Sequence, residues 1–282
     1  MRSQKSSDSV LDRLPPFPAA AVAVLQACAA ETAGLNEIAD AIAMEEVLAT
    51  TVMGAANSTA LGAVQPASNL VLAVWRLGSQ AVRGLAVATV LKRSSGRVFQ
   101  QAGLARAGLW RHNFAVAAAS AGAAAAGPGV DPSGAHLAGL LHDVGKMLFA
   151  AELGAAYATC LQQAADTGAP LSEVEAELLG MDHAELGASA VANWGFSAGV
   201  VEAVAQHHKS RETAAPLTLA VIVGNHVAAA MGLVVGPHSE ATCAADAENL
   251  ELEVGRAFLA HAEAALTHEL PRIEAVVEAV GA

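Results

Sequence analysis

The chain has 282 residues, of which 54% are hydrophobic and only 4% are aromatic. This length is enough for one large domain or two smaller ones with a buried core. An apolar content made largely of Ala, Val and Leu favours close helix packing over an aromatic-rich β-sandwich. The formal net charge is −12, so the average field repels nucleic-acid phosphates and anionic lipid surfaces. We therefore expect no direct binding to nucleic acid and no association with a membrane.

The cysteines and the amino terminus indicate a cytoplasmic protein. Residues 1–10 are polar and lack the apolar segment of a secretory signal. Cys28, Cys160 and Cys243 are odd in number, far apart and in no Cys-x-x-Cys pair, which suits a reducing compartment and argues against a thiolate metal site.

Residues 214–237 carry no formally charged side chain and are long enough to cross a bilayer. The same stretch contains Pro216, Asn225 and His226 and has no Lys or Arg at its carboxy-terminal end. Polar residues at this depth favour a buried core helix over a membrane span.

Helical periodicity dominates the first third of the chain. A flexible leader over residues 1–13 ends at Leu14-Pro15-Pro16-Phe17-Pro18, where the prolines block a helix. Residues 14–93 are then expected to form an amino-terminal helical subdomain. Its predicted helices cover residues 19–30, a short segment capped by Asn36, residues 47–55, 69–77 and 79–92, with Gly78 separating the last two.

A linker rich in Ser, Gly and Arg at residues 93–100 precedes a larger helical subdomain over residues 101–282. We find no alternating strand pattern and no internal repeat, so the predicted fold class is all-α. The predicted helices of this part cover residues 104–126, 131–149, 171–179, 183–194, 197–206, 217–233 and 250–280, the last interrupted or kinked at Pro271.

The most informative motif is the dipeptide His142-Asp143, which falls inside a predicted apolar helix. Adjacent side chains on a helix point about 100° apart, yet both can reach a cation placed between their directions. Lys146 lies one turn further on, where it can neutralise a carboxylate or approach a phosphate. The motif therefore predicts a site for a cation, a phosphate or both.

Further histidines follow the same order along the chain: His112, His183 and the pair His207-His208. Imidazoles with one bridging carboxylate suit a divalent metal such as Fe, Mn, Zn or Ni, and five histidines with Asp143 would suffice for a two-metal site. A lone histidine is more often a core or capping residue than a ligand. We expect His136, His238, His261 and His268 to be core or capping residues of this kind, and not ligands.

Taken together, these motifs resemble the HD superfamily of metal-dependent phosphohydrolases, and within it the HD-related output domain, or HDOD. The resemblance extends from Leu14 to about Leu233. It includes, besides the histidines and the His142–Lys146 segment, Ala56-Asn57-Ser58, Trp75-Arg76-Leu77-Gly78 and Asn193-Trp194-Gly195-Phe196. It implies an all-helical fold and a role in bacterial signalling or regulation.

The chain departs at three places from the patterns of the families that it resembles, which include the related HD-GYP cyclic-di-GMP phosphodiesterases. No Gly-Tyr-Pro loop follows His207-His208, Asn225 aligns with the last aspartate ligand of the superfamily, and Glu45-Glu46 replaces an early Asp-Pro. An amide oxygen brings no negative charge. The resemblance therefore implies a partly eroded site, in which a position made by His112, His142, Asp143 and Asn225 is weakened. The position made by Asp143, His183, His207 and His208 is complete.

Three functions remain open from the sequence. The first is a regulatory domain that acts through contacts with a signalling protein and carries a vestigial metal site. The second is an active metal-dependent phosphohydrolase of a nucleotide or cyclic dinucleotide, with Asp143 and Lys146 as catalytic residues. The third is a purely structural helical domain whose histidines make hydrogen bonds.

Overall fold

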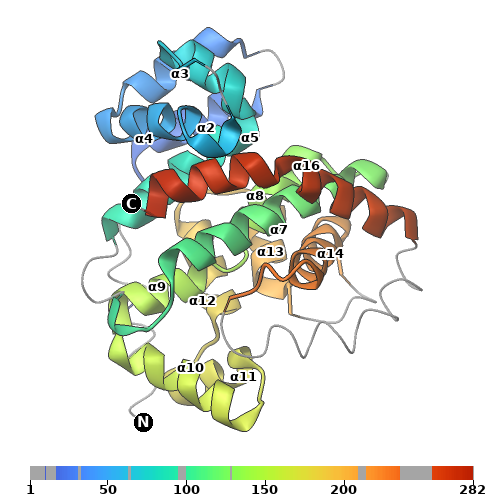
Figure 1. Ribbon diagram of the computed structural model, residues 1–282. Helices are drawn as coiled ribbons and strands as arrows, with labels where there is room; N and C mark the ends of the chain where they lie inside the picture. Colours follow the sequence, from blue (N-terminus) through green and yellow to red (C-terminus); the bar gives the residue numbers. More distant parts are fainter. Residues whose placement is uncertain are drawn as a thin grey trace. The chain divides into compact units, whose positions relative to one another are not determined.

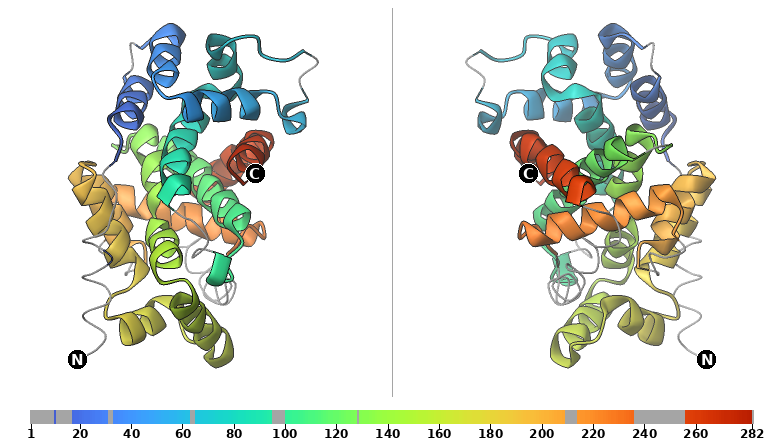
Figure 2. Two further views of the ribbon diagram at one scale, coloured as in Figure 1. Left: turned by 90° about the vertical axis from the view of Figure 1, so that its left-hand side faces the viewer. Right: turned by 90° about the vertical axis from the view of Figure 1, so that its right-hand side faces the viewer.

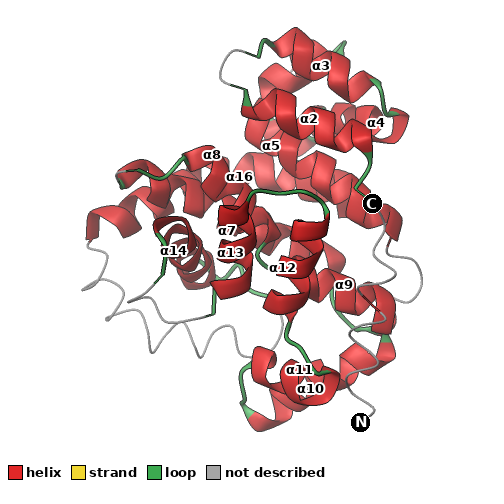
Figure 3. Ribbon diagram, turned by 180° about the vertical axis from the view of Figure 1, so that it is seen from behind, coloured by secondary structure: helices red, strands yellow, loops and turns green. Residues whose placement is uncertain are grey.

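A computed structural model gives the structure of the chain. It describes residue 10 and residues 17–30, 33–62, 65–94, 100–127, 129–208, 214–235 and 256–281. Every regular element in these ranges is helical, and Figure 3 shows helices and loops with no strand there. The predicted all-α class is confirmed. Apart from Val10, the predicted leader lies outside the described residues, as do residues 95–99 of the predicted linker.

The chain forms two compact units. The histidine unit comprises Met1–Pro16 and Ser95–Thr267, and the amino-terminal unit comprises Phe17–Ser94 and His268–Ala282. The sequence analysis grouped the chain end with the larger subdomain, whereas here it joins the amino-terminal unit. Side-chain contacts explain the difference, because Ser58 donates a hydrogen bond to Glu278 and Arg272 Nε donates to the carbonyl oxygen of Arg76 at 3.5 Å.

Helices of the amino-terminal unit pack into a bundle, in which the segments before residue 95 are coloured blue to teal in Figure 2 and α16 is red. They are α2 (Ala19–Ala29), α3 (Leu35–Ala43), α4 (Glu46–Ala56), the short 3₁₀ helix η1 (Thr59–Leu61), α5 (Leu70–Ser94) and the second half of α16 (Arg256–Gly281). Arg76 connects them by donating to the carbonyl oxygens of Ala56 at 2.8 Å and Gln65 at 2.9 Å. The resemblance motifs at residues 56–58 and 75–78 therefore maintain the fold of this unit.

Two sequence predictions about helix ends had different outcomes. The break at Gly78 is confirmed, because its backbone has φ 79° and leaves the helical conformation within α5. The cap at Asn36 is wrong. α3 begins at Leu35 with Gly34 as its N-cap, two residues before the predicted cap, and Glu37 Oε2 accepts the Gly34 N–H at 3.2 Å.

One described helix is long and apolar enough to cross a membrane by length and composition alone, at Leu70–Leu91. It is 56% buried inside the protein, as expected for a core helix, and it contains the Gly78 break. In the described part of the uncharged stretch, residues 214–235, the chain forms the shorter helix α14 (Pro216–Ala230).

The histidine unit is built around α7 (Arg106–Ala126), which is almost completely buried from Leu109 to Ala124. α7 packs against α8 (Pro132–Leu141) and α14, as Figure 1 shows. Glycines allow this close approach, since a Cβ on Gly139 would lie 2.8 Å from Ser120 Oγ and a Cβ on Gly224 would overlap the same atom. Three helix backbones therefore meet around Ser120.

The remaining helices of this unit lie beyond α8 in sequence. They are α9 (Val144–Leu153), α10 (Ala155–Thr167), α11 (Leu171–Leu179), α12 (His183–Asn193), α13 (Ala198–Gln206) and, after α14, the first half of α16. The sequence analysis missed α10. The predicted interruption of the last helix is absent, because α16 continues through Pro271.

The prediction that His142-Asp143 lies inside one helix over residues 131–149 is wrong. α8 ends at Leu141 with His142 as its C-cap, and α9 begins at Val144. Asp143, at φ −101° and ψ 14°, lies in the turn between the two helices. The backbone turn, and not divergence around one helix, sets the directions of these two side chains.

Candidate metal centre

Asp143 lies at the centre of a cluster of histidines and is only 1% exposed. Its Oδ2 atom is 3.6 Å from His112 Nε2 and 3.5 Å from His142 Nε2. Its Oδ1 atom is 3.4 Å from His183 Nε2 and 3.6 Å from His207 Nε2. Each carboxylate oxygen thus faces two imidazoles, and one carboxylate connects both halves of the cluster.

Helix termini supply most of these side chains. His142 and His207 are the C-caps of α8 and α13, His183 is the first residue of α12, and His208 follows directly after His207. His112 comes from the interior of α7. Because α8 packs on α7 and α13, and α12 packs on α9 and α13, residues far apart in sequence converge on the turn at Asp143.

Gly145 brings α12 close to this turn. A Cβ at this position would overlap the backbone carbonyl of His183. Only a residue without a side chain therefore allows the amino-terminal end of α9 to approach that of α12 so closely. This contact sets the separation of Asp143 and His183.

Hydrogen bonds fix the tautomers of three imidazoles. The Nδ1 atoms of His112, His142 and His207 lie 2.6, 2.7 and 2.7 Å from the carbonyl oxygens of Leu233, Gly139 and Val204. A carbonyl oxygen only accepts, so each Nδ1 must donate and each Nε2 carries a lone pair when the ring is neutral. Burial lowers the pKa of all three imidazoles, which favours the neutral form.

These lone pairs are directed at an ionised carboxylate. Burial raises the pKa of Asp143, but His142 and Lys146 outweigh it and hold the value well below the usual range. Among the described residues, Asp143 Oδ1 and the Nε2 atoms of His142 and His207 are buried without a hydrogen-bond partner. Acceptors that face one another in a buried site are unfavourable unless a cation lies between them. The donor set therefore fits a metal ion.

Two groups of side chains place their ligand atoms within 4.8 Å of one another. They are Asp143, His183, His207 and His208, and His112, His142 and Asp143. We name them the Oδ1 position and the Oδ2 position after the Asp143 oxygen that each uses. Imidazole nitrogens with one carboxylate suit Fe, Mn, Zn or Ni.

Of the remaining residues that the sequence singled out, Lys146 contacts the cluster, Asn225 lies on α14 and Glu45 lies in the amino-terminal unit. Lys146 Nζ donates to Asp143 Oδ2 at 2.6 Å, and its side chain is 12% exposed. Asn225 is half-buried on α14, next to Gly224, which contacts α7. Its role as a ligand remains a prediction. Glu45 is the N-cap of α4 in the other unit and accepts from Leu48 N at 2.6 Å.

The histidines that were given only a structural reading are spread over the chain. His136 is buried on α8, while His261 and His268 are exposed on α16. His238 lies outside the described residues. None of the three described ones belongs to either ligand group.

Sequence reasoning missed Glu175, which is fully buried on α11. Glu175 Oε2 lies 2.5 Å from His183 Nδ1 and accepts the His183 N–H at 2.8 Å, while Oε1 accepts from the Tyr157 hydroxyl at 2.7 Å. Burial raises the pKa of Glu175, but His183 and Tyr157 outweigh it and lower the net value. A sequence signal existed, because Glu175 lies one position after Val174 and four before Leu179, on the apolar face of α11.

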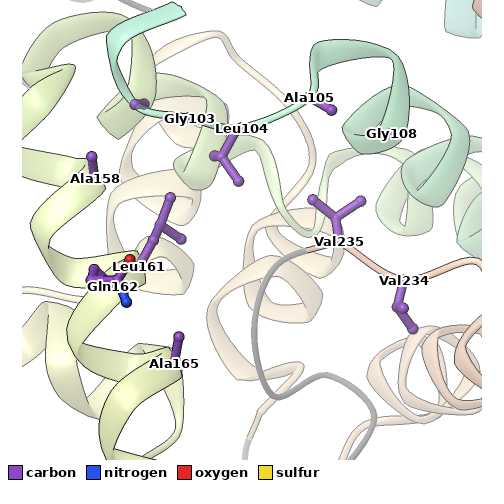
Figure 4. Close-up of a pocket in the computed structure, with 11 residues that line it drawn as sticks. Gly103, Leu104, Ala105, Gly108, Ala158, Leu161, Gln162, Ala165, Val234 and Val235 are labelled. Carbon is purple, nitrogen blue, oxygen red and sulfur yellow. The ribbon is translucent and has the colours of Figure 1, made fainter.

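A separate cavity of 460 Å³ lies between the start of α7, α10 and the segment after α14. Figure 4 shows that Leu104, Leu161 and Val235 point into it, with Gln162 as the polar side chain. No histidine of the cluster lines this cavity. It is therefore distinct from the metal centre.

Comparison with known proteins gives one family. The sequence profile of the HDOD domain matches residues 14–210. A curated relative, an uncharacterised protein of Treponema pallidum (strain Nichols), is 23% identical over 211 residues, which are 73% of this chain and 40% of that protein. The chain thus spans about two fifths of the length of this relative.

Solved structures share the fold at low identity. An HDOD domain protein of unknown function from Geobacter sulfurreducens has a TM-score of 0.73 and 20% identity, with 99% of this chain and 97% of that chain covered. A Shewanella amazonensis SB2B protein provisionally assigned as a phosphohydrolase has a TM-score of 0.71 and 24% identity, with 98% of both chains covered. A Marinobacter aquaeolei VT8 protein provisionally assigned to signal transduction has a TM-score of 0.69 and 20% identity, with 99% and 66% covered.

Proposed function

Because the chain belongs to the HDOD domain family, we propose that it is a regulatory domain of bacterial signal transduction that acts through protein contacts and holds a divalent metal at its histidine cluster. The observation that supports metal binding is the set of buried imidazole lone pairs directed at the Asp143 carboxylate. The provisional assignment of the Marinobacter aquaeolei protein to signal transduction supports the regulatory role.

The two metal positions differ in whether a positively charged side chain already contacts the Asp143 oxygen that each would use. Lys146 Nζ already lies 2.6 Å from Oδ2, so a cation at the Oδ2 position must share that oxygen with an ammonium group. Oδ1 has no hydrogen-bond partner among the described residues. A metal should therefore fill the Oδ1 position first, held by Asp143, His183, His207 and His208.

This asymmetry favours regulation over hydrolysis. A two-metal phosphohydrolase needs both cations, because together they activate the attacking water and stabilise the leaving oxygen. Asp143 is the only carboxylate in the two ligand groups found among the described residues, and Asn225 would add no charge. One metal bound at the Oδ1 position could stabilise the fold of the histidine unit. It would not supply the second cation that two-metal hydrolysis needs.

Exposed apolar side chains support a role in protein contacts. Four of the five exposed large hydrophobic residues in the described part of the chain lie in the amino-terminal unit. Met44 is 74% exposed and Trp75 is 67% exposed. Large exposed apolar groups are common at protein interfaces. With the net charge of −12, a signalling protein is a better partner than nucleic acid, and we place the domain in the cytoplasm.

The alternative function is a metal-dependent phosphohydrolase of a nucleotide or cyclic dinucleotide. Two observations favour it: Lys146 is partly accessible beside Asp143, and His208 is the exposed member of its ligand group. An anionic substrate could approach the cluster from this edge. Asp143 would then hold the metal, and Lys146 would contact a phosphate.

One pair of measurements separates the two functions. Elemental analysis of the freshly purified chain should find a bound transition metal, and hydrolysis of cyclic dinucleotides should stay negligible even with excess Mn²⁺ or Fe²⁺. Robust turnover that Asp143→Ala abolishes would overturn the regulatory proposal. A protein without metal under every loading condition would contradict the metal centre.

A further inference from the structure

The hydrogen-bond partner of His183 differs in kind from those of the other oriented histidines. His112, His142 and His207 each face a backbone carbonyl, which is a neutral acceptor. His183 faces the carboxylate of Glu175. A carboxylate that accepts from the second ring nitrogen fixes the tautomer and raises the basicity of the coordinating nitrogen. Among these four rings, His183 is the one whose Nδ1 faces a carboxylate.

Glu175 holds both the backbone and the ring of His183. Its Oε2 atom lies within hydrogen-bond distance of the His183 backbone N–H, at 2.8 Å, and of Nδ1, at 2.5 Å. The first bond anchors the carboxylate to the backbone of α12, and the second restrains rotation of the ring. Nε2 is thereby kept facing Asp143 Oδ1 at 3.4 Å and His208 Nε2 at 2.7 Å, the two other ligand groups of the Oδ1 position nearest to it.

Tyr157 fixes the carboxylate in turn. Its hydroxyl donates to Oε1 at 2.7 Å, and its ring packs against Phe149 with centroids 5.4 Å apart. Tyr157 and Phe149 are both fully buried. Phe149 belongs to α9, the helix that starts directly after Asp143. Contacts from Phe149 through Tyr157 and Glu175 therefore connect this helix to His183.

Helix capping accounts for the bond from the His183 N–H to Glu175 Oε2, but not for the contact between that oxygen and Nδ1 of the ring. α12 already has an N-cap, because Asp182 accepts from Glu185 N at 2.8 Å and Glu185 reaches back to Asp182 N at 3.4 Å. A buried carboxylate is unfavourable unless all its interactions are satisfied. Glu175 nevertheless occupies a position on the apolar face of α11, and its Oε2 atom lies 2.5 Å from His183 Nδ1.

We infer that Glu175, held by Tyr157, is a positioning residue that makes the Oδ1 position the tighter of the two metal positions. The inference rests on the metal binding proposed above. Glu175 touches no metal in this scheme and acts only through the orientation and basicity of His183.

The test compares Glu175→Gln with Glu177→Gln, a control on the exposed face of the same helix. Glutamine keeps the volume and one acceptor oxygen but removes the charge. Zn²⁺ affinity measured by chelator competition should fall about 10- to 100-fold in Glu175→Gln and stay unchanged in Glu177→Gln. Tyr157→Phe should lower it by a smaller factor. Thermal unfolding of each variant confirms that it is folded.

A metal-free measurement separates this inference from the proposed function. In ¹H–¹⁵N spectra that detect imidazole nitrogens, His183 of the parent should appear as the Nδ1–H tautomer with a strongly downfield proton, which should move upfield in Glu175→Gln. Failure of the parent to bind Zn²⁺ would defeat the metal proposal while leaving this readout intact. Unchanged affinity in Glu175→Gln, or a His183 ring that samples both tautomers in the parent, would overturn the inference.

Discussion

Lys146 Nζ lies 2.6 Å from Asp143 Oδ2, so an ammonium group holds the oxygen that the Oδ2 position would use. Replacement of Lys146 by Met should raise the affinity for a second metal equivalent. Two unit charges about 4 Å apart interact by about 1 kcal/mol even at the dielectric constant of water, and a divalent cation doubles this. We expect a gain of about tenfold or more, measured by calorimetric titration of the metal-free protein with Mn²⁺.

The charge-preserving variant Lys146→Arg is the matched control and should bind the second equivalent as the parent does. Removal of the ammonium also leaves a buried carboxylate without its counter-charge, so metal-free Lys146→Met should unfold at a lower temperature. Equal affinities in the Met and Arg variants would show that Lys146 does not compete with a metal.

The ligand assignment predicts unequal effects of two histidine substitutions. His183→Ala removes a ring whose Nε2 faces Asp143 Oδ1, whereas His268→Ala removes a side chain that is 73% exposed on α16. Metal content measured by mass spectrometry of the elements should fall strongly in the first variant and remain at the parent level in the second. Similar contents in both would count against the Oδ1 position.

The order of the histidines along the chain was enough to predict their convergence, because the motif at residues 142–146 and its partners resemble a family with a known fold. The local conformation at Asp143 was not predictable in the same way. Apolar residues on both sides suggested one continuous helix, but the chain turns at Asp143. Hydrophobic periodicity indicates which face of a helix is buried. It does not reveal a two-residue turn between two helices that are both apolar.

Glu175 and Tyr157 show a second limit of sequence reasoning. A glutamate in a short helix is usually solvated. The apolar residues of α10 do follow a helical spacing, at positions 157, 160, 161 and 164, but this spacing does not say which residue Tyr157 contacts. Only the packing of α9, α10 and α11 shows that the two side chains meet. A charged residue at an apolar position of a helix is the signal to look for.

Gly145 offers a test of the helix contact beneath the site. In Gly145→Ala the new methyl group would overlap the carbonyl of His183, so α9 and α12 must separate. Overpacking of this kind destabilises proteins by about 1–3 kcal/mol. Urea unfolding should show that loss, and Zn²⁺ affinity should fall with it, because Asp143 and His183 move apart.

Gly54→Ala is the control, since Gly54 lies within α4 and a Cβ there meets nothing within 4 Å. It should be neutral or stabilising by about 0.5–1 kcal/mol, because alanine favours a helix interior. A Gly145→Ala variant as stable as Gly54→Ala would contradict the described approach of the two helices.

Acid should destabilise the metal-free protein before its carboxylates titrate. Burial lowers the pKa of His112, His142 and His207 below the ordinary value of 6.5, so below that pH the unfolded chain binds more protons than the folded one. The free energy of unfolding should therefore fall as the pH drops from 7 toward 5, by up to about 1.4 kcal/mol per pH unit for each histidine. The lowered pKa of Asp143 acts only below its ordinary 3.8.

Urea unfolding at pH 7.5 and 5.5 measures this dependence. His207→Gln removes one of the four imidazoles whose pKa burial lowers, the fourth being His208, and should show a smaller difference between the two pH values than the parent. Bound metal should oppose the effect at neutral pH and be released in acid, since protons compete for the same nitrogens. Stability that does not change between the two pH values would mean that the rings are not held neutral.

Asn225→Asp tests how far the weakened position accounts for the absence of hydrolysis. Asn225 stands where the resemblance to the HD superfamily places a final aspartate ligand, and a carboxylate there adds a negative charge for a cation to bind. The affinity for a second Mn²⁺ should rise, and Asn193→Asp, an exposed position on α12, should leave it unchanged. Hydrolysis of cyclic dinucleotides should stay low in both variants, because no Gly-Tyr-Pro loop follows His208. If Asn225→Asp instead gains rapid turnover, loss of one carboxylate alone separates this domain from an enzyme, and the regulatory role would rest on that single substitution.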